Sequence, residues 1–97
     1  MIYHVTDKGS WEQALDAGFY EAPSLHSEGF IHASLLEQVA GVLERYYKNK
    51  TELVLLHIDE LKLVPELKYE LAPKVNEIFP HVFGPVNMDA IINVKLI

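Results

Sequence analysis

Three histidines of this 97-residue chain share one local frame, and they are the residues best suited to carry chemistry. In each case an apolar residue precedes the histidine by two positions, and a hydroxyl or aromatic residue follows it by two. The triplets are Ile2/His4/Thr6, Phe30/His32/Ser34 and Phe79/His81/Phe83. Because side chains alternate across a strand with period two, each triplet is expected on one face of an extended segment. Imidazole changes charge near neutral pH, so a converged set would suit acid–base, anion-binding or metal chemistry.

A metal site is one alternative for these histidines. The neutral nitrogens of His4, His32 and His81 are of the type that binds zinc, with a fourth position left for a hydrolytic water. The chain has no HExxH motif or comparable close-spaced pair, so this alternative needs three separated segments to converge. A histidine-ligated hydrolase therefore stays open as a function, and no residue is assigned as a metal ligand.

Each candidate residue also has a structural interpretation. His4 can be a hydrogen-bonded histidine of the core, since buried polar groups are routinely paired. Ser34 begins the segment Ser34-Leu35-Leu36-Glu37, which matches a capping box and predicts Ser34 as a helix N-cap. That helix terminus would still present amides and a dipole to a phosphate beside His32. Glu70 can be an ordinary exposed carboxylate on a strand.

The first half of the chain must position His4 and His32. Residues 2–6 are predicted as a strand, and a capping box at Ser10-Trp11-Glu12-Gln13 predicts a short helix that ends at Gly18. Residues 20–28 are predicted as a loop because Pro23, serines and Gly29 punctuate them, and residues 30–33 as a second strand. The main helix is predicted from Ser34 to about residue 48, with apolar residues at helical spacing.

The second half must place Glu70 and His81. Residues 53–58 form a nearly continuous apolar run, which predicts a buried central strand. Residues 67–71 are predicted as a strand, and a loop then leads through Pro73 and Asn76 to a segment bounded by Pro80 and Gly84 that carries His81. A last strand is predicted within residues 89–97. The chain is therefore predicted as one α+β domain, residues 1–97, with a split or mixed β-sheet and two main helices.

Composition excludes several classes of protein. The net charge is −6, with a single arginine, Arg45, and seven scattered lysines, so the basic footprint of a duplex nucleic-acid binder is missing. No segment is apolar over the length that crosses a bilayer, and the N-terminus lacks a secretory pattern, so we expect no membrane and a cytoplasmic location. The absence of cysteine excludes disulfides and thiolate sites. The oligomeric state is not predictable from these features.

Several segments together resemble the domain of unknown function 952 family. The most distinctive are Gly29-Phe30-Ile31-His32-Ala33-Ser34 and Phe79-Pro80-His81-Val82-Phe83-Gly84-Pro85. Ile2-Tyr3-His4, Trp11-Glu12, Ala22-Pro23-Ser24, Leu53-Val54-Leu55-Leu56 and Asp89-Ala90 extend the resemblance over essentially the whole chain. The resemblance implies a fold similar to the ADP-ribosyltransferases, whose split sheet holds nicotinamide adenine dinucleotide (NAD) in a cleft. Fold analogy does not establish activity, which depends on the site.

The resemblance assigns roles to particular residues. His4 corresponds to a histidine that holds the ribose in related transferases, and His32 with Ser34 to the second polar position of the cleft, where a tyrosine is common. Glu70 is the candidate for the carboxylate that stabilises an oxocarbenium-like state, with Glu77 second. His4, His32 and Glu70 are thus the catalytic candidates, and the ligand-binding candidates are Thr6, Ser34, His81 and Phe83.

Three classes of function remain open on this basis. The first is glycosyl transfer of the ADP-ribosyltransferase type with NAD as substrate. The second is a noncatalytic nucleotide or small-molecule binding module that uses the same histidines without needing Glu70. The metal-dependent hydrolase is the third. No resident cofactor is predicted, and the expected partner is a small nucleotide ligand.

Overall fold

The N-terminal strand and helix meet at Asp7. The computed structural model describes all residues 1–97, and it places β1 at Ile2–Asp7 and α1 at Lys8–Ala17. The Asp7 carboxylate accepts the backbone N–H of Ser10 at 2.7 Å and the Ser10 hydroxyl at 2.8 Å. Asp7 is therefore the N-cap, and the prediction that the helix begins at Ser10 is wrong by one turn because an aspartate three residues earlier takes that role. Gly18, at φ 87°, ends the helix as predicted.

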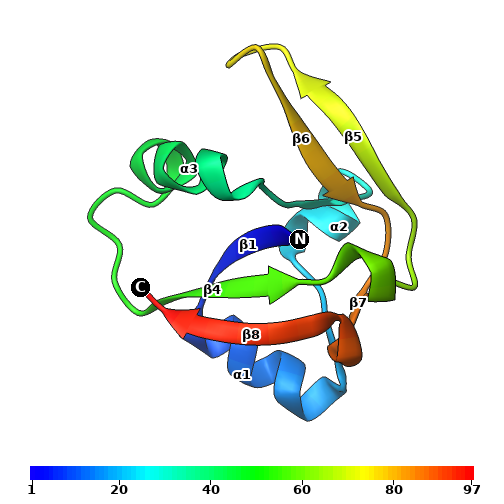
Figure 1. Cartoon of the computed structure of the whole chain (residues 1–97). Helices are drawn as coiled ribbons and strands as arrows, with labels where there is room; N and C mark the ends of the chain where they lie inside the picture. Colours follow the sequence, from blue (N-terminus) through cyan, green and yellow to red (C-terminus); the bar gives the residue numbers. More distant parts are fainter.

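A three-stranded antiparallel sheet, in the order β1-β4-β8, forms the centre of the molecule (Figure 1). The middle strand β4 is Leu53–Ile58, and β8 is Ile91–Leu96. Five of the six β4 residues are buried, which confirms the central strand predicted from the apolar run. The last predicted strand is confirmed in β8.

A second sheet has the order β3-β6-β5 and carries the other histidines. Its strands are β3 (Ile31–His32), β6 (Glu77–Val82) and β5 (Leu67–Ala72). The prediction of a loop around His81 is wrong, because residues 77–82 pair along their whole length with β5. The resulting hairpin extends away from the rest of the molecule (Figure 1). Every strand pair is antiparallel, so the sheet is split but not mixed.

Residues 31–34 join the two sheets. β3 pairs with β6, and the Ala33 N–H donates to the Pro80 carbonyl at 3.0 Å. One residue later the chain pairs with β1 instead: the Tyr3 N–H donates to the Ser34 carbonyl at 2.8 Å, and the Ser34 N–H to the Tyr3 carbonyl at 2.7 Å. The chain thus crosses from one sheet to the other within four residues.

Ser34 is consequently not a helix N-cap. Its backbone is used in the bridge to Tyr3, and a 3₁₀ turn, Leu36–Gln38, precedes α3 at Val39–Tyr46. The Gln38 side chain accepts the Leu35 N–H at 2.9 Å, so the capping interaction falls one residue later than the sequence predicted.

The remaining short elements lie where loops were expected. α2 spans Pro23–Ser27, so the predicted loop at 20–28 is wrong in that part: Pro23 occupies the first turn of a helix, where its missing N–H has no cost. β2 (Phe19–Tyr20) pairs with β7 (Val86–Asn87). Two further 3₁₀ turns are Glu60–Lys62 and Met88–Ala90.

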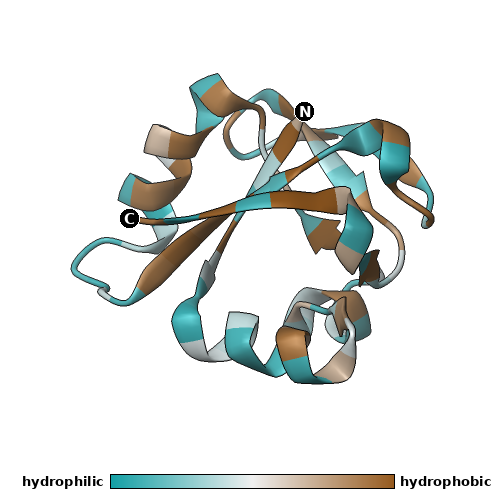
Figure 2. Ribbon diagram, turned by 60° about the horizontal axis from the view of Figure 1, so that its bottom comes forward, coloured by the Kyte–Doolittle hydropathy of each residue, from teal (hydrophilic) through white to brown (hydrophobic).

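The core lies on both faces of the β1-β4-β8 sheet. On one face Ile2, Leu56 and Tyr20 pack with Ala14 of α1, in a cluster of 12 buried residues. On the other face Val5 and its neighbours on β4 pack against α3. Figure 2 shows the largely apolar strands of this sheet between helices in which polar and apolar residues alternate. No helix has the length and apolar character needed to cross a membrane.

Candidate functional site

A cleft of about 790 Å³ opens where the two sheets diverge beside β1. β1 contributes one side, the β5–β6 hairpin and its turn the opposite side, and α2 and α3 parts of the remaining walls. Half of the 24 lining residues are hydrophobic, among them Phe30, Tyr46, Tyr47 and Phe79. This volume and lining are typical of a small-molecule site.

The cleft collects most of the residues that the sequence singled out. His4, Thr6, His32, Ser34 and His81 all line it. His32 and His81 are opposite each other in the β3–β6 pairing, and the bridge between Tyr3 and Ser34 brings His4 beside them. Two candidates do not line it. Glu70 bonds His81 but does not itself line the cleft. Phe83 lies next to the cleft residue Phe30, with its ring centroid 5.5 Å from that of Phe30. The carboxylate expected to touch the ligand thus contacts a histidine instead.

His4 is held in a buried hydrogen-bond network. Its Nδ1 bonds the carbonyl oxygen of His32, and its Nε2 lies 2.8 Å from the hydroxyl of Tyr20, which in turn lies 2.9 Å from the hydroxyl of Thr6. Burial lowers the pKa of His4 from 6.5 to about 4, partly opposed by the bond to the carbonyl, so the ring is neutral at pH 7.

The proton positions follow from that neutrality. A carbonyl can only accept, so Nδ1 of His4 carries the hydrogen and Nε2 accepts from Tyr20. Hydroxyl hydrogens rotate to suit their partners, so Thr6 then donates to Tyr20. Burial raises the pKa of Tyr20 to about 12, which keeps this hydroxyl protonated. Both nitrogens of His4 are therefore occupied before any ligand binds.

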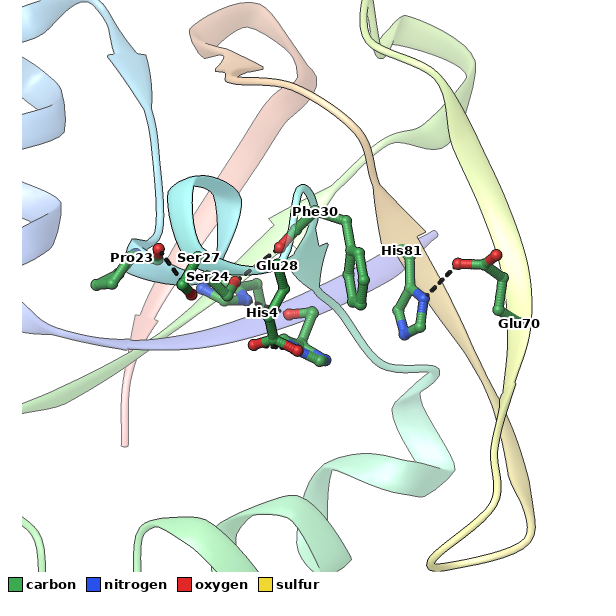
Figure 3. A network of polar contacts seen from close by, with 9 residues as sticks. His4, Pro23, Ser24, Ser27, Glu28, Phe30, Glu70 and His81 are labelled. Atoms are coloured by element: carbon green, nitrogen blue, oxygen red, sulfur yellow. Dashed lines mark hydrogen bonds and ion pairs between the residues drawn. The ribbon is translucent and has the colours of Figure 1, made fainter.

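His81 has a different environment. Its Nδ1 lies 2.7 Å from a carboxylate oxygen of Glu70, and its ring stacks on Phe30 with centroids 4.1 Å apart and planes inclined by 20°. Figure 3 shows the ring held between Phe30 and Glu70. Nε2 of His81 has no hydrogen-bond partner in the protein and is not fully buried, and His81 lines the cleft.

His32 completes the cluster of rings at this end of the cleft. Its centroid lies 5.3 Å from that of His81 and 4.8 Å from that of Phe30. Its Nε2 lies 3.2 Å from both carboxylate oxygens of Glu28, and its side chain is about half exposed. Two carboxylate–histidine pairs therefore flank Phe30, one deep and one at the surface.

The charged groups of the cleft are few. Apart from histidines, only Asp7, Glu28 and Lys74 among the lining residues carry charge, and Arg45 is not among them. Hydrogen bonds from Ser10 lower the pKa of Asp7. Lys74, in the turn between β5 and β6, is the sole permanent cation, so it marks the end of the cleft best suited to an anionic group.

The sequence did not predict the roles of Tyr20, Glu28 and Lys74. Tyr20 and Glu28 fall in the stretch expected to be a loop, and Lys74 in a turn. No local pattern marks them, because chain reversals rather than regular spacing place Tyr20 and Glu28 beside their histidine partners and Lys74 at the cleft. Glu28 approaches His32 only because Gly29, at φ 90°, turns the backbone between them.

The histidines do not form a metal site. No group of three or more histidine, cysteine, aspartate or glutamate side chains is arranged to hold a metal ion. One reason is visible at His4, whose two nitrogens already bond the His32 carbonyl and the Tyr20 hydroxyl. The geometry gives no support to the metal-dependent hydrolase.

Comparisons with known proteins give the family but no activity. The model of the family described as "Protein of unknown function (DUF952)" matches residues 5–94. No curated protein matches the chain. The crystal structure of protein CC0527 from Caulobacter crescentus is similar, with a TM-score of 0.88 and 26% identity over 97% of this chain and 82% of that one.

Two more structures of CC0527 agree with that comparison. The crystal structure of a double mutant has a TM-score of 0.87 and 25% identity over the same shares of the two chains. The solution structure has a TM-score of 0.82 and 26% identity, and it covers 97% of this chain and 81% of that one. Because the family model matches residues 5–94 of its 97 residues, this chain belongs to the DUF952 family of proteins of unknown function.

Proposed function

We propose that this protein binds a nucleotide-type ligand, of the NAD or ADP-ribose kind, in the histidine-lined cleft. The observation that carries the proposal is that His4, His32 and His81, which are far apart in the sequence, line one cleft of small-molecule size. The resemblance to ADP-ribosyltransferases suggests the dinucleotide, and the cleft supplies groups that match its parts.

The polar groups of the cleft suit the hydroxyls of a ribose. Ser34 Oγ has no hydrogen-bond partner in the protein and His81 Nε2 offers a free nitrogen, so both are available to hydroxyl groups. The aromatic side chains of Phe79, Tyr46 and Tyr47 give a planar base apolar surface to contact. Lys74 provides the cation for a phosphate at the hairpin end of the cleft.

Thermal denaturation of the full chain tests the proposal, with NAD, ADP-ribose and AMP titrated separately. A ligand at ten times its dissociation constant stabilises by about 1.4 kcal/mol, which raises the midpoint by roughly 5–10 °C in a domain of this size. We expect His32→Ala and Ser34→Ala to reduce that shift by removing cleft groups. His26→Ala is the matched control, because His26 lies on α2, pairs with Glu21 and does not line the cleft.

The outcomes separate binding from nonbinding plainly. A shift with NAD or ADP-ribose that survives His26→Ala and is reduced by His32→Ala supports the site. No shift with any of the three nucleotides at millimolar concentration would sink the proposal.

A further inference from the structure

We infer that His81 is a general base that Glu70 holds in position, and that it takes a proton from a ligand hydroxyl or a water in the cleft. The inference rests on the proposed nucleotide function and extends it from binding to catalysis. His81 is the catalytic residue in this scheme, and Glu70 acts through it as a positioning residue.

The geometry of the pair is that of an oriented base. The Nδ1–Oε1 distance of 2.7 Å is typical of a hydrogen bond strengthened by charge. Stacking on Phe30 fixes the plane of the ring, and 9% exposure of the His81 side chain keeps it from rotating into solvent. Two contacts of different kinds therefore hold the imidazole in one orientation.

The carboxylate also selects the tautomer. Ionised Glu70 can only accept, so Nδ1 of His81 carries the hydrogen and the Nε2 lone pair faces the cleft. When Nε2 takes a proton, the ring becomes a cation in direct contact with the Glu70 carboxylate, which stabilises it. A histidine oriented by a third group and open at its other nitrogen is the recurring arrangement of general bases.

The other two histidines are less suited to this role. Both nitrogens of His4 are bonded inside the protein, so a ligand would have to displace Tyr20 or the His32 carbonyl. His32 is half exposed, and the 3.2 Å contacts with Glu28 are longer than that between His81 and Glu70. Only His81 combines a short carboxylate bond, burial and a free nitrogen.

The proton transfer can be written for NAD as the bound ligand. The water O–H bond breaks as Nε2 of His81 takes the proton, and the water oxygen forms a bond to C1′ of the nicotinamide ribose. The bond between C1′ and the ring nitrogen breaks, and its electron pair leaves with nicotinamide. The products are nicotinamide and ADP-ribose, and His81 then releases its proton to solvent. No oxidant or further reactant is needed.

The test measures binding and turnover of NAD on the same full-length preparations. Calorimetry gives the dissociation constant, and chromatography gives the rate of nicotinamide release at saturating NAD. We expect His81→Ala to lower that rate by about 100-fold or more, the usual contribution of a general base. The rate is compared at saturating NAD for each variant, so that a loss of affinity from the missing Nε2 contact does not enter it. Glu70→Leu should lower it by about tenfold or more, and Glu70→Gln, whose amide oxygen still accepts from Nδ1, by less. Glu66→Gln is the control, because Glu66 is exposed to solvent and directly precedes β5.

A second readout reports the positioning role directly. Nitrogen-15 NMR of the imidazole rings at pH 8 should show His81 with hydrogen on Nδ1 in the wild type and in Glu70→Gln. Glu70→Leu should give a mixture of tautomers. A purely structural role for Glu70 would leave the tautomer unchanged when the carboxylate is removed, and that result would overturn the inference.

Failure of this inference and failure of the proposed function look different. Binding of NAD without nicotinamide release above the uncatalysed rate overturns the general base and leaves the binding function in place. Release at equal rates by the wild type and His81→Ala does the same. Absence of NAD binding overturns the proposed function itself, and the catalytic inference falls with it.

Discussion

At the scale of single residues, the three histidines have three different tasks despite their common local frame. His4 is a buried, neutral group that links β1, the β3 segment and β2 through its two hydrogen bonds. His32 is an exposed ring paired with Glu28, and His81 is a buried ring with one free nitrogen. Residue type and spacing are the same in all three, so the differences come from what surrounds each ring.

His4 should make the protein less stable in weak acid. Its pKa is 6.5 when unfolded and about 4 when folded, so the unfolded state takes up a proton first as the pH falls. The stability due to neutral His4 is complete above pH 6.5 and is lost between pH 6.5 and 4. The loss from this residue is about 2 kcal/mol between pH 7.5 and pH 5.

Urea denaturation at the two pH values checks this expectation. The His4→Gln variant, which keeps a donor and an acceptor but does not titrate, should have a lower stability at pH 7.5 and lose about 2 kcal/mol less than the wild type on going to pH 5. Equal losses in both proteins would show that His4 does not titrate in this window.

Tyr20→Phe should cost about 1–3 kcal/mol of stability, because it leaves His4 Nε2 and the Thr6 hydroxyl without their partner in a buried place. The loss is measured by urea denaturation at pH 7.5. Tyr46→Phe removes the same atom from a side chain that is 62% exposed and has no hydrogen bond through its hydroxyl, so it should change stability by less than about 0.5 kcal/mol. Similar effects of the two variants would contradict the network.

At the scale of elements, the end of a helix was predictable where a glycine supplies the left-handed conformation that stops it. Gly18 was identified as a helix stop from its type alone, and its φ of 87° confirms the left-handed conformation. The N-termini were harder, because several polar residues near each start can make the capping hydrogen bond. Asp7 is the N-cap in place of Ser10, and Leu35 with Gln38 replaces the expected pair Ser34 and Glu37.

Two glycine-to-alanine changes should therefore have opposite effects. Gly18→Ala places a Cβ at positive φ and should cost about 1 kcal/mol. Gly41→Ala, inside α3, gains helix propensity of up to about 1 kcal/mol, since its Cβ meets only the movable end of Arg45 at 3.1 Å. Urea denaturation of both variants checks the signs, and a loss of stability in Gly41→Ala would mean that Arg45 cannot move aside.

The sequence predicted the strands β4, β5 and β8 but not β6, and only β6 has a proline inside the strand. β4 was evident as a buried apolar run, whereas Pro80 lies in the middle of β6. A proline is disfavoured inside a sheet because it lacks an N–H. Here its carbonyl accepts from Ala33 and the neighbouring residues carry the pairing, so β6 persists.

At the scale of the whole molecule, the cleft exists because two sheets share one short segment and then diverge. The β1-β4-β8 sheet has helices on both faces. The β5–β6 hairpin is held at its base by β3, by Val82 in the core and by the bond from Tyr69 to Glu60, and nearer its turn by Gln38, which donates to the Ile78 carbonyl at 2.8 Å. The two sides of the cleft therefore differ in how firmly they are held.

Hydrogen exchange should reveal this difference. Amides of β4 should exchange only through global unfolding, and those of residues 72–77 at the hairpin turn much faster through local opening. A ligand bound in the cleft should slow amide exchange in the hairpin. In α1 the exchange rate should change only as much as the global stability of the protein changes. Uniform protection of β4 and the hairpin turn would show that the two sheets open as one unit.

The sequence by itself determined the α+β composition, the central strand, the helix stop at Gly18 and the strands that carry His4 and His32. These follow from local alternation, apolar runs and residue conformational preference, which depend on near neighbours in the chain. Only the tertiary structure decided that Glu70 bonds His81, that Tyr20 closes the His4 network and that His81 has a free nitrogen. Those partners lie 11 to 16 residues apart in sequence, and only the strand pairing and chain reversals brought them together.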